Sequence, residues 1–223
     1  MTQTRAPRTI VTGTGQLALD LVDALDGAVP LQCGFTTEAE VSAAMDRAVR
    51  ELGGVDQIVH AWLPGALLER ADLAVVDETT WATACEGAME AAWWLARHAR
   101  APLAPTRGSL VFVVPTVGMA GSAGYAMLAA VAEGIRVLAK GCGRQWGADG
   151  VTVNTVAVAP HAVLETEIAD GLQRAVSLSQ PAMGGPGSLD HDIAPLIRLL
   201  GHDDAHFLTS ATLVADGGLW MGL

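Results

Sequence analysis

The chain has 223 residues and is short of positive charge, cysteine and aromatic side chains. Its 13 lysines and arginines stand against 24 aspartates and glutamates, which gives a formal net charge of −11 at pH 7. Binding to a phosphate backbone needs a basic face, and so does binding to an anionic membrane surface. We therefore expect neither nucleic acid nor a membrane among the partners of this protein.

Cysteine is too sparse to cross-link the chain. Cys33, Cys85 and Cys142 lie far apart, and an odd number of cysteines makes a poor disulfide framework. No pair of them has the spacing of metal ligands, so we interpret them as buried thiols in a reducing cytosol. Residues 1–8 lack the apolar stretch of a secretion signal. Both observations predict a cytoplasmic protein.

Patterns typical of metal sites and membrane spans are also missing. His202 and His206 stand four residues apart but have no convincing third ligand, so we predict no metal site. The stretch between Arg107 and Glu133 has no charged residue and is long enough to cross a bilayer. Because Pro115 and three glycines interrupt it, we interpret it as a buried strand, a glycine-rich loop and a buried helix.

Apolar residues are abundant instead. They make up 51% of the chain, and its mean hydropathy is +0.35. This composition excludes disorder and supports one large core, so we expect a single domain over residues 1–223. The abundance of alanine and glycine is typical of a GC-rich bacterial genome.

Short apolar runs alternate with helical patterns along the chain. The expected strands are Thr9–Thr12, Val29–Cys33, Val55–His60, Ser109–Val114, Val151–Ala159 and Ala211–Ala215. The expected helices are Leu17–Leu25, Val41–Leu52 after a capping box at Thr37–Glu40, Thr80–Arg100 with a stop before Pro102, Tyr125–Trp146 and Asp190–Leu200. This alternation predicts an α/β fold with a parallel sheet covered on both faces.

Ligands of such sheets bind at the carboxyl ends of the strands. The segments that follow the expected strands are Gly13–Gly15, His60–Leu63, Pro115–Gly118 and Ala159–Val163. These four segments therefore hold the candidate functional residues.

Four segments of the chain have the most characteristic sequences: Gly108–Val114, Glu133–Lys140, Arg144–Asn154 and Phe207–Gly218. They resemble the short-chain dehydrogenase/reductase family, and the similarity extends over nearly the whole chain. The resemblance implies a single Rossmann-like, doubly wound parallel sheet. In that family a Ser, a Tyr-x-x-x-Lys pair and an Asn carry the proton transfer, and NAD(P) carries the hydride.

The family's catalytic residues are replaced in this chain. Alignment on the four segments puts Pro115 at the Ser position, Leu128 at the Tyr position, Ala132 at the Lys position and Ala88 at the Asn position. None of these side chains can move a proton, so the resemblance predicts that the hydride-transfer site is absent.

A second alignment would use Tyr125 as the family's tyrosine. Tyr125 stands three residues before Leu128, and its lysine would then be Ala129. The Tyr–Lys pair would still be incomplete, and the alignment would need a gap before the downstream match.

The cofactor pattern of the family is also reduced. Its glycine-rich first turn brings the backbone to a diphosphate at a helix N-terminus. Here the turn keeps Gly13 and Gly15 but lacks the last glycine, and Gly34 stands where the family has an aspartate that meets adenine. Compared with the family, this chain lacks one strand and the helix that follows it near the N-terminus. We therefore expect six strands in the order 2-1-3-4-5-6, and no bound NAD(P).

His60, Thr116, Tyr125 and His161 all follow strands that end in the same crevice. They are consistent with a rebuilt pocket for dehydration, cyclisation or isomerisation without a cofactor. The other interpretation is a filled cavity, for which large side chains are available at Trp62, Met119 and Met127.

The helices expected over Thr80–Arg100 and Tyr125–Trp146 pair across a dimer axis in the family. Trp93 and Trp94 add aromatic area there, and we expect one to point to the core and the other to an interface. The resemblance thus predicts assembly with a homologous, catalytically active subunit, as a heterodimer or heterotetramer.

Three functions remain open from the sequence. The favoured one is a non-catalytic subunit, or pseudoenzyme, that supports an active oxidoreductase of the family. The second is a cofactor-independent dehydratase, cyclase or isomerase that uses the old crevice. The third is an NAD(P)-dependent ketoreductase or dehydrogenase, for which the alignment of the lost residues would have to be wrong.

Overall fold

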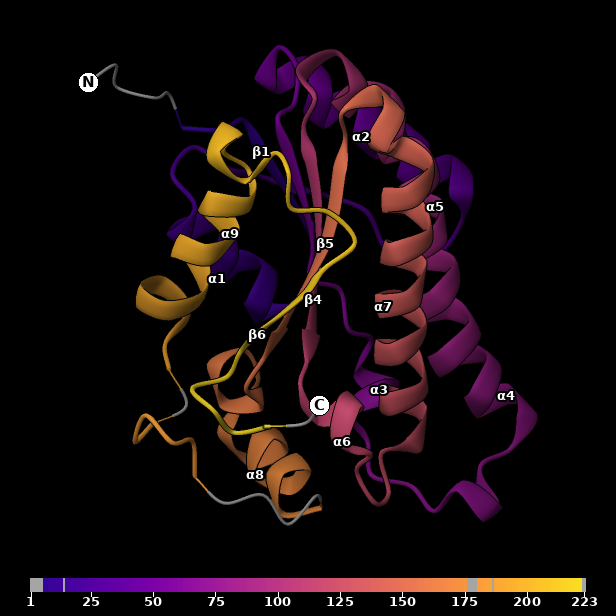
Figure 1. Cartoon of the computed structure of the whole chain (residues 1–223). Helices are drawn as coiled ribbons and strands as arrows, with labels where there is room; N and C mark the ends of the chain where they lie inside the picture. Colours follow the sequence, from indigo (N-terminus) through magenta and orange to yellow (C-terminus); the bar gives the residue numbers. More distant parts are fainter. Residues whose placement is uncertain (1–5, 14, 176–179, 186, 222–223) are drawn as a thin grey trace.

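The computed structural model describes residues 6–13, 15–175, 180–185 and 187–221. In these residues six strands form one parallel sheet in the order β2-β1-β3-β4-β5-β6 (Figure 1). The strands are β1 (Thr9–Thr12), β2 (Val29–Leu31), β3 (Gln57–His60), β4 (Ser109–Pro115), β5 (Thr152–Val158) and β6 (Thr212–Ala215). The predicted α/β fold and strand order are confirmed.

The chain reverses its direction along the sheet at β1. Ile10 of β1 faces Val29 of β2 on one side and Ile58 of β3 on the other. Strand β2 lies directly beside β1, and helix α1 (Gln16–Ala24) is the only helix between them among the residues that the structure describes. This is the arrangement that the missing strand–helix step predicts.

Helices cover both faces of the sheet (Figure 1). The helices α2 (Glu38–Leu52), α5 (Gly87–Leu103) and α7 (Ala126–Trp146) pack on the face that carries Ile10 and Phe112. The helices α1 and α9 (Ala194–Leu200) pack on the face that carries Val11 and Val111. The central strands β4 and β5 are buried along their whole length, which is why they read as largely apolar runs.

Four shorter helices complete the structure: α3 (Gly65–Leu68), α4 (Glu78–Trp81), α6 (Val117–Ala120) and α8 (Thr166–Ala175). Helices α3, α6 and α8 lie at the end of the sheet where the strands finish (Figure 1). Helix α4 leads into α5 through a π-helical turn at Ala82–Glu86. A second π-helical turn at Leu189–Ile193 leads into α9.

The capping box predicted at the start of α2 is half confirmed. The backbone N–H of Glu40 donates to Thr37 Oγ1 at 3.2 Å, and Gly53 ends the helix in the left-handed conformation. The carboxylate of Glu40, however, accepts from the N–H groups of Gly34 at 2.6 Å and Thr36 at 3.1 Å. It therefore ties α2 to the loop after β2 instead of closing the box.

Two expectations about helices are wrong. The predicted stop before Pro102 fails, because α5 continues to Leu103 with Pro102 inside it. Leu103 is fully buried, so packing of this last turn offsets the backbone donor that proline removes. The helices expected from the sequence also leave out α8, which forms between Ala159 and Asp190.

The tryptophans of α5 divide as expected. Trp93 is 47% exposed, whereas Trp94 packs against the core. Whether Trp93 meets another chain stays a prediction.

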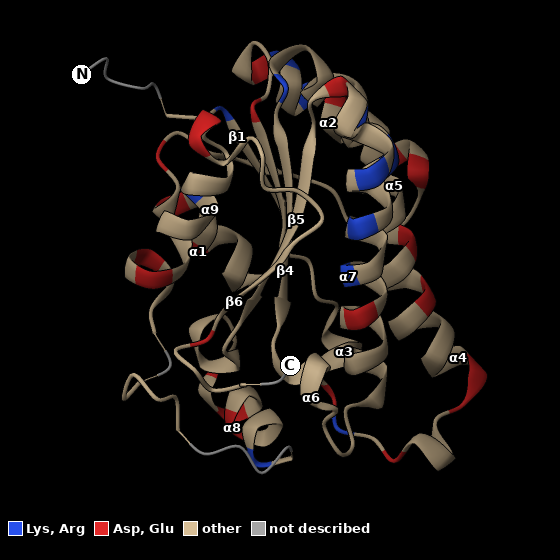
Figure 2. Cartoon of the chain, in the orientation of Figure 1, with Lys and Arg blue, Asp and Glu red and all other residues tan. Residues whose placement is uncertain are grey.

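Charge is unevenly distributed over the helices. Acidic residues occur on most of them, whereas basic residues recur along α7 (Figure 2). In the part of the chain that the structure describes, no helix is both long enough and apolar enough to cross a bilayer.

Candidate functional site

Tyr125, the only tyrosine in the chain, lies at the carboxyl edge of the sheet. It is buried and occupies the position just before α7. Its backbone N–H donates to the carbonyl oxygen of Ser122 at 2.9 Å, and its own carbonyl accepts from Ala129 N–H at 3.0 Å. These two bonds fix the residue at the point where the loop after α6 becomes a helix.

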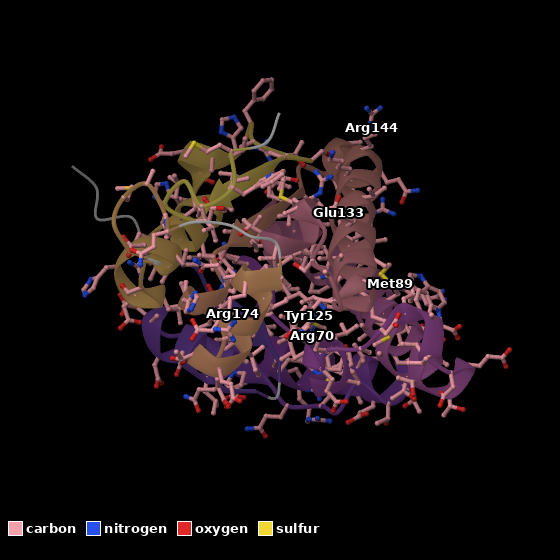
Figure 3. All side chains as sticks on the ribbon, turned by 90° about the horizontal axis from the view of Figure 1, so that it is seen from below. Arg70, Met89, Tyr125, Glu133, Arg144 and Arg174 are labelled. Carbon is pink, nitrogen blue, oxygen red and sulfur yellow. The ribbon has the colours of Figure 1, made fainter. Side chains whose placement is uncertain are left out.

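A cavity of about 540 Å³ opens beside Tyr125. It is lined by residues that follow β3, residues before α7 and residues of α8: Leu68, Arg70, Tyr125, Glu167, Ile168, Gly171, Arg174 and Ala175. Figure 3 looks onto this edge of the molecule and shows Arg70, Tyr125 and Arg174 next to one another. The volume is that of a small-molecule site, and the position is where parallel sheets bind ligands.

Gly171 of α8 faces the Tyr125 hydroxyl. A Cβ atom at position 171 would lie 2.7 Å from Tyr125 Oη and 3.8 Å from Cζ. Any side chain at this position would therefore collide with the hydroxyl. The glycine lets α8 approach the phenol closely while the hydroxyl keeps its place at the cavity.

His161 contacts Asp170, the residue that precedes Gly171 in α8. His161 Nε2 lies 2.7 Å from Asp170 Oδ1, and the imidazole is 19% exposed. The other oxygen of Asp170 lies 3.7 Å from Arg174 Nη1. Helix α8 thus gathers two of the predicted residues, Tyr125 and His161, although His161 does not line the cavity itself.

His60 does not belong to this cavity. Its Nδ1 lies 2.7 Å from Thr12 Oγ1, and its ring packs edge-on against Phe35 and Phe112 with centroids 5.9 and 5.5 Å away. Burial lowers the pKa of His60 to about 3, so the imidazole is neutral at physiological pH. Its Nε2 has no hydrogen-bond partner among the residues that the structure describes.

Thr116 is also a core residue. Its N–H and its hydroxyl both donate to the carbonyl oxygen of Val158, at 2.8 and 3.1 Å. The two hydrogen bonds link the ends of β4 and β5. The crevice predicted for His60, Thr116, Tyr125 and His161 is therefore divided, with the first two residues buried in the core.

The four replaced catalytic positions are core positions too. Ala88, Pro115, Leu128 and Ala132 are all buried. A Cβ at Gly118 would lie only 2.7 Å from the Ala132 Cβ, so α6 and α7 are in close contact at that point.

Two described glycines, Gly13 and Gly15, lie between β1 and α1. Gly13 has a φ of +148°, and a Cβ there would lie 2.6 Å from the Ala18 Cβ and 3.4 Å from the carbonyl oxygen of Ala61. Gly15 precedes the nine-residue helix α1, whose N-terminus has neither a side-chain cap nor an acidic residue. Thr14 lies outside the described residues. Uncapped N–H groups behind a glycine turn fit the diphosphate of a dinucleotide.

The loop expected to meet adenine has a different structure. Gly34 donates its N–H to Glu40, and this hydrogen bond is the main cause that lowers the pKa of Glu40. Phe35 is buried with a φ of +55°, and its ring lies 5.2 Å from the ring of Trp62. This chain therefore lacks an acidic group at position 34 and presents aromatic rings beside it.

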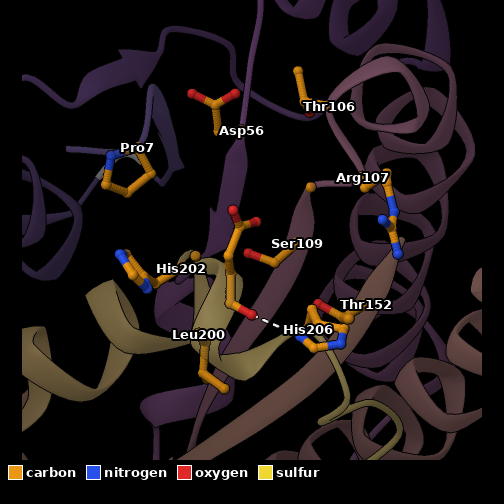
Figure 4. A pocket seen from close by; sticks show the side chains of 12 residues that line it. Pro7, Asp56, Thr106, Arg107, Ser109, Thr152, Leu200, His202 and His206 are labelled. Carbon is orange, nitrogen blue, oxygen red and sulfur yellow. Dashed lines mark hydrogen bonds between the residues drawn. The ribbon is translucent and has the colours of Figure 1, made fainter. Parts of the chain in front are cut away.

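A second cavity, of about 260 Å³, lies on the opposite edge of the sheet, against the first residues of β4 and β5 (Figure 4). His202 and His206 both line it, and His206 Nδ1 lies 2.7 Å from the carbonyl oxygen of Asp203. Within the described ranges, no group of three or more His, Cys, Asp or Glu residues is placed to hold a metal ion. This cavity is separate from the candidate site at Tyr125.

A family model described as enoyl-(acyl carrier protein) reductase matches residues 10–220. The chain belongs to the short-chain dehydrogenase/reductase family. The match runs from β1 to the segment beyond β6, so the resemblance seen in the sequence is confirmed over the whole sheet.

Two relatives within the family are oxidoreductases by name. The 3-oxoacyl-[acyl-carrier-protein] reductase FabG of Vibrio cholerae serotype O1 is 28% identical over 201 residues, which cover 88% of this chain and 79% of the relative. The cis-4-hydroxycyclohexanecarboxylate dehydrogenase of Sinomonas cyclohexanicum is 30% identical over 212 residues, which cover 94% of this chain and 83% of the relative.

Solved structures share the fold. ElxO with NADP bound has a TM-score of 0.73 at 17% identity, covering 96% of this chain and 98% of that one. A variant of ElxO with NADPH bound has a TM-score of 0.74, also at 17% identity. At this level of identity the similarity shows the family's fold.

The prediction of a non-catalytic subunit is wrong. The family model and both relatives carry the names of reductases or dehydrogenases. The same names disagree with a cofactor-independent dehydratase or isomerase. The prediction followed from the absence of proton-transferring side chains at four buried positions. It did not take into account that the fold brings Tyr125 to the edge of a cavity.

The prediction that no NAD(P) binds is wrong as well. Structures of the same fold hold NADP and NADPH, and the family model and the relatives carry the names of reductases or dehydrogenases. The physical reason lies in the turn after β1. A diphosphate is held by backbone N–H groups, and Gly13 and Gly15 still precede an uncapped helix N-terminus although the family's last glycine is absent.

The sequence analysis missed Arg70, Gly171 and Arg174. Gly171 and Arg174 belong to α8, which was not expected as a helix. A signal for α8 was present, since Ile168, Leu172 and Ala175 recur at helical spacing and pack against the core. Arg70 follows β3 at a distance of ten residues, and no local pattern indicates where it points.

Proposed function

We propose that this protein is an NAD(P)-dependent oxidoreductase that interconverts a carbonyl compound and an alcohol. The observation that carries the proposal is the position of Tyr125. The only phenol in the chain stands at the start of α7, at the carboxyl edge of a Rossmann-like sheet and beside a cavity of about 540 Å³.

The names of the relatives support this reaction class. One is a 3-oxoacyl-[acyl-carrier-protein] reductase and the other a dehydrogenase of a hydroxycyclohexanecarboxylate. Both names describe the same chemical change at a carbon that bears oxygen, in opposite directions. The reaction class carries over to this chain more readily than either substrate does.

The cofactor would be held at the turn after β1. Gly13 and Gly15 would admit the diphosphate to the N-terminus of α1, where no side chain caps the backbone N–H groups. When bound, the nicotinamide supplies or accepts the hydride. We extend this role from the cofactors in the structural neighbours.

Tyr125 would exchange the proton of the substrate oxygen. Two backbone hydrogen bonds hold the residue, and Gly171 lies close to its hydroxyl. A phenol donates a proton when a carbonyl becomes an alkoxide and accepts it in the reverse direction. The chain supplies neither the serine nor the lysine that accompany the catalytic tyrosine in the family, so we expect a slower reaction than in complete members.

The test combines cofactor binding with turnover. Titration of NADPH, followed by its fluorescence, measures binding to the purified protein, and loss of NADPH absorbance with a panel of ketones measures turnover. Tyr125→Phe removes only the hydroxyl. We expect kcat/KM to fall by about a hundredfold or more while the Kd for NADPH stays unchanged. A variant as active as the native protein would refute the role of Tyr125, and failure to bind NADPH or NADH would refute the cofactor.

We further propose that α5 and α7 form an assembly surface for another chain of the family, either a homologous subunit or a second copy. The exposed Trp93 and the presence of both long helices support this surface. Free, buried cysteines at 33, 85 and 142 support a reducing compartment such as the bacterial cytoplasm.

A further inference from the structure

Two arginines stand at the rim of the Tyr125 cavity. Arg70 comes from the segment after α3, and Arg174 comes from the last turn of α8. Figure 3 shows Arg174 beside Tyr125 and Arg70 directly below it. The chain has only 13 basic residues against 24 acidic ones, so two arginines around one small cavity run against its overall charge.

Arg70 is held by packing instead of by an acidic partner. Ala71 N–H donates to the carbonyl oxygen of Gly124 at 2.8 Å, which fixes the backbone beside it. A Cβ at Gly124 would lie 2.7 Å from Arg70 Cγ and 2.9 Å from Nε, so the arginine stem lies directly across this glycine. Among the described residues Arg70 has neither an ion pair nor a side-chain hydrogen bond. Its guanidinium donors are available to a ligand.

Arg174 is only weakly paired. Its one ion pair among the described residues is with Asp170 Oδ2 at 3.7 Å, close to the limit of an ion pair. The other oxygen of Asp170 lies 2.7 Å from His161. The side chain of Arg174 is 73% exposed, so it is able to turn toward a bound anion.

The charge of the lining favours an anion. Arg70 and Arg174 oppose one carboxylate in the lining, that of Glu167, which leaves a net charge of +1. The rest of the wall is apolar and comes from Leu68, Ile168 and Ala175, with the Tyr125 hydroxyl among them. An apolar wall with cationic groups at its mouth suits a molecule with an apolar body and an anionic end.

We infer that the substrate is a carbonyl compound or alcohol that carries an anionic group, a carboxylate or a phosphate, bound by Arg70 and Arg174. This inference rests on the proposed function, because it places the reacting oxygen at Tyr125. The anionic end then lies at the mouth of the cavity, and the apolar body spans the wall between them. Arginine pairs bind both anions through several N–H donors at once.

The first arm of the test measures binding without turnover. Calorimetric titrations of the native protein use hexanoate, its neutral analogue hexanamide, and inorganic phosphate. We expect at least one anion to bind about tenfold or more tightly than hexanamide. Arg70→Met and Arg174→Met keep an apolar stem, and each should weaken that anion about tenfold. Arg144→Met on α7 removes the same charge away from the cavity and should bind as the native protein does (Figure 3).

The three ligands also separate the two kinds of anion. Tight binding of hexanoate assigns a carboxylate, and tight binding of phosphate alone assigns a phosphorylated substrate. The inference is overturned if neither anion binds more tightly than hexanamide. It is also overturned if Arg70→Met and Arg174→Met bind the anion as tightly as Arg144→Met does.

The second arm uses turnover and separates this inference from the proposed function. Levulinate and methyl levulinate carry the same ketone, but only the first carries a negative charge. We expect NADPH-dependent reduction to favour levulinate about tenfold in kcat/KM, and this preference should disappear in the double Arg70→Met, Arg174→Met variant. If a phosphate was the anion bound in the first arm, phosphorylated hydroxyacetone replaces levulinate and hydroxyacetone replaces the ester.

Failure of the two ideas would look different. If the protein reduces the neutral and the charged ketone equally well, the proposed function holds and the anion site is refuted. If no ketone is reduced but an anion binds and depends on both arginines, the anion site holds and the proposed function is refuted.

Discussion

Replacement of Gly171 by alanine tests the geometry of the site most directly. A Cβ at position 171 would lie 2.7 Å from Tyr125 Oη, whereas ordinary contact begins near 3.4 Å. The hydroxyl and α8 would therefore have to separate by about 0.7 Å. Tyr125 is buried, so its ring has little room to yield, and we expect the phenol to leave its position.

The size of the effect on catalysis follows from that displacement. A misplacement of about 1 Å in a reacting group costs about a hundredfold in rate. We expect Gly171→Ala to lower kcat/KM for NADPH-dependent ketone reduction by about tenfold to a hundredfold. The Kd for NADPH should stay unchanged, because the turn after β1 that would hold the cofactor lies elsewhere on the sheet edge.

The effect on stability should be small by comparison. Overpacking costs about 1–3 kcal/mol, and replacing glycine by alanine in a helix regains about 1 kcal/mol. The net change in the free energy of unfolding is then a loss of about 0–2 kcal/mol. Thermal or urea unfolding of the same preparations measures this change and separates it from loss of activity.

Gly141→Ala is the matched control. Gly141 lies in α7, and a Cβ there would meet nothing within 4 Å. We expect unchanged activity and a free energy of unfolding raised by up to about 1 kcal/mol. If Gly171→Ala keeps full activity while its unfolding is altered, then the position of the Tyr125 hydroxyl does not matter for turnover and the assignment of the cavity is refuted.

Three further predictions concern other parts of the chain. His60 has a folded-state pKa of about 3 against 6.5 in the unfolded chain, so the unfolded state binds more protons and stability falls as pH drops from 6.5 toward 3. His60→Gln should remove this contribution to the slope of the free energy of unfolding against pH, which is about 1.4 kcal/mol per pH unit at most. Urea unfolding at several pH values measures the slope, and an unchanged slope would contradict the buried neutral imidazole. Gly13→Ala should weaken NADPH binding by about tenfold or more and destabilise the protein by about 1–3 kcal/mol. The reason is that a Cβ at position 13 would lie 2.6 Å from the Ala18 Cβ. Native affinity for NADPH in a fluorescence titration would argue against this turn as the cofactor site. Trp93→Ala should change the free energy of unfolding by no more than about 0.5 kcal/mol but reduce the mass of the assembly in light scattering, and an unchanged mass would argue against α5 as an interface.

The fold was largely predictable because its signals are local. The apolar runs Ser109–Pro115 and Thr152–Val158 are continuous since both faces of the sheet are covered, and such runs are typical of parallel strands. The strand order followed from the missing strand–helix step. The prediction failed where long-range packing decides, as at Pro102, whose helix continues because Leu103 is buried against the core.

The candidate site was only partly predictable for the same reason. The end of a strand and the start of a helix pointed to Tyr125 and His161, and both lie against α8. His60 occupies the same kind of position in the sequence, yet aromatic packing with Phe35 and Phe112 puts it in the core. Spacing along the chain does not distinguish a side chain that enters a cavity from one that fills the space between sheet and helices.

The sequence by itself determined the family, the parallel sheet and the edge where ligands bind, because periodicity and strand-end residues are properties of short segments. Only the tertiary structure decided which residues meet at that edge. Arg70, Tyr125 and Arg174 come from three segments that are far apart in the chain, yet they line one cavity. Gly124 admits the close approach of Arg70, and Gly171 admits that of Tyr125. Such contacts are set by the packing of whole elements, so no local pattern encodes them.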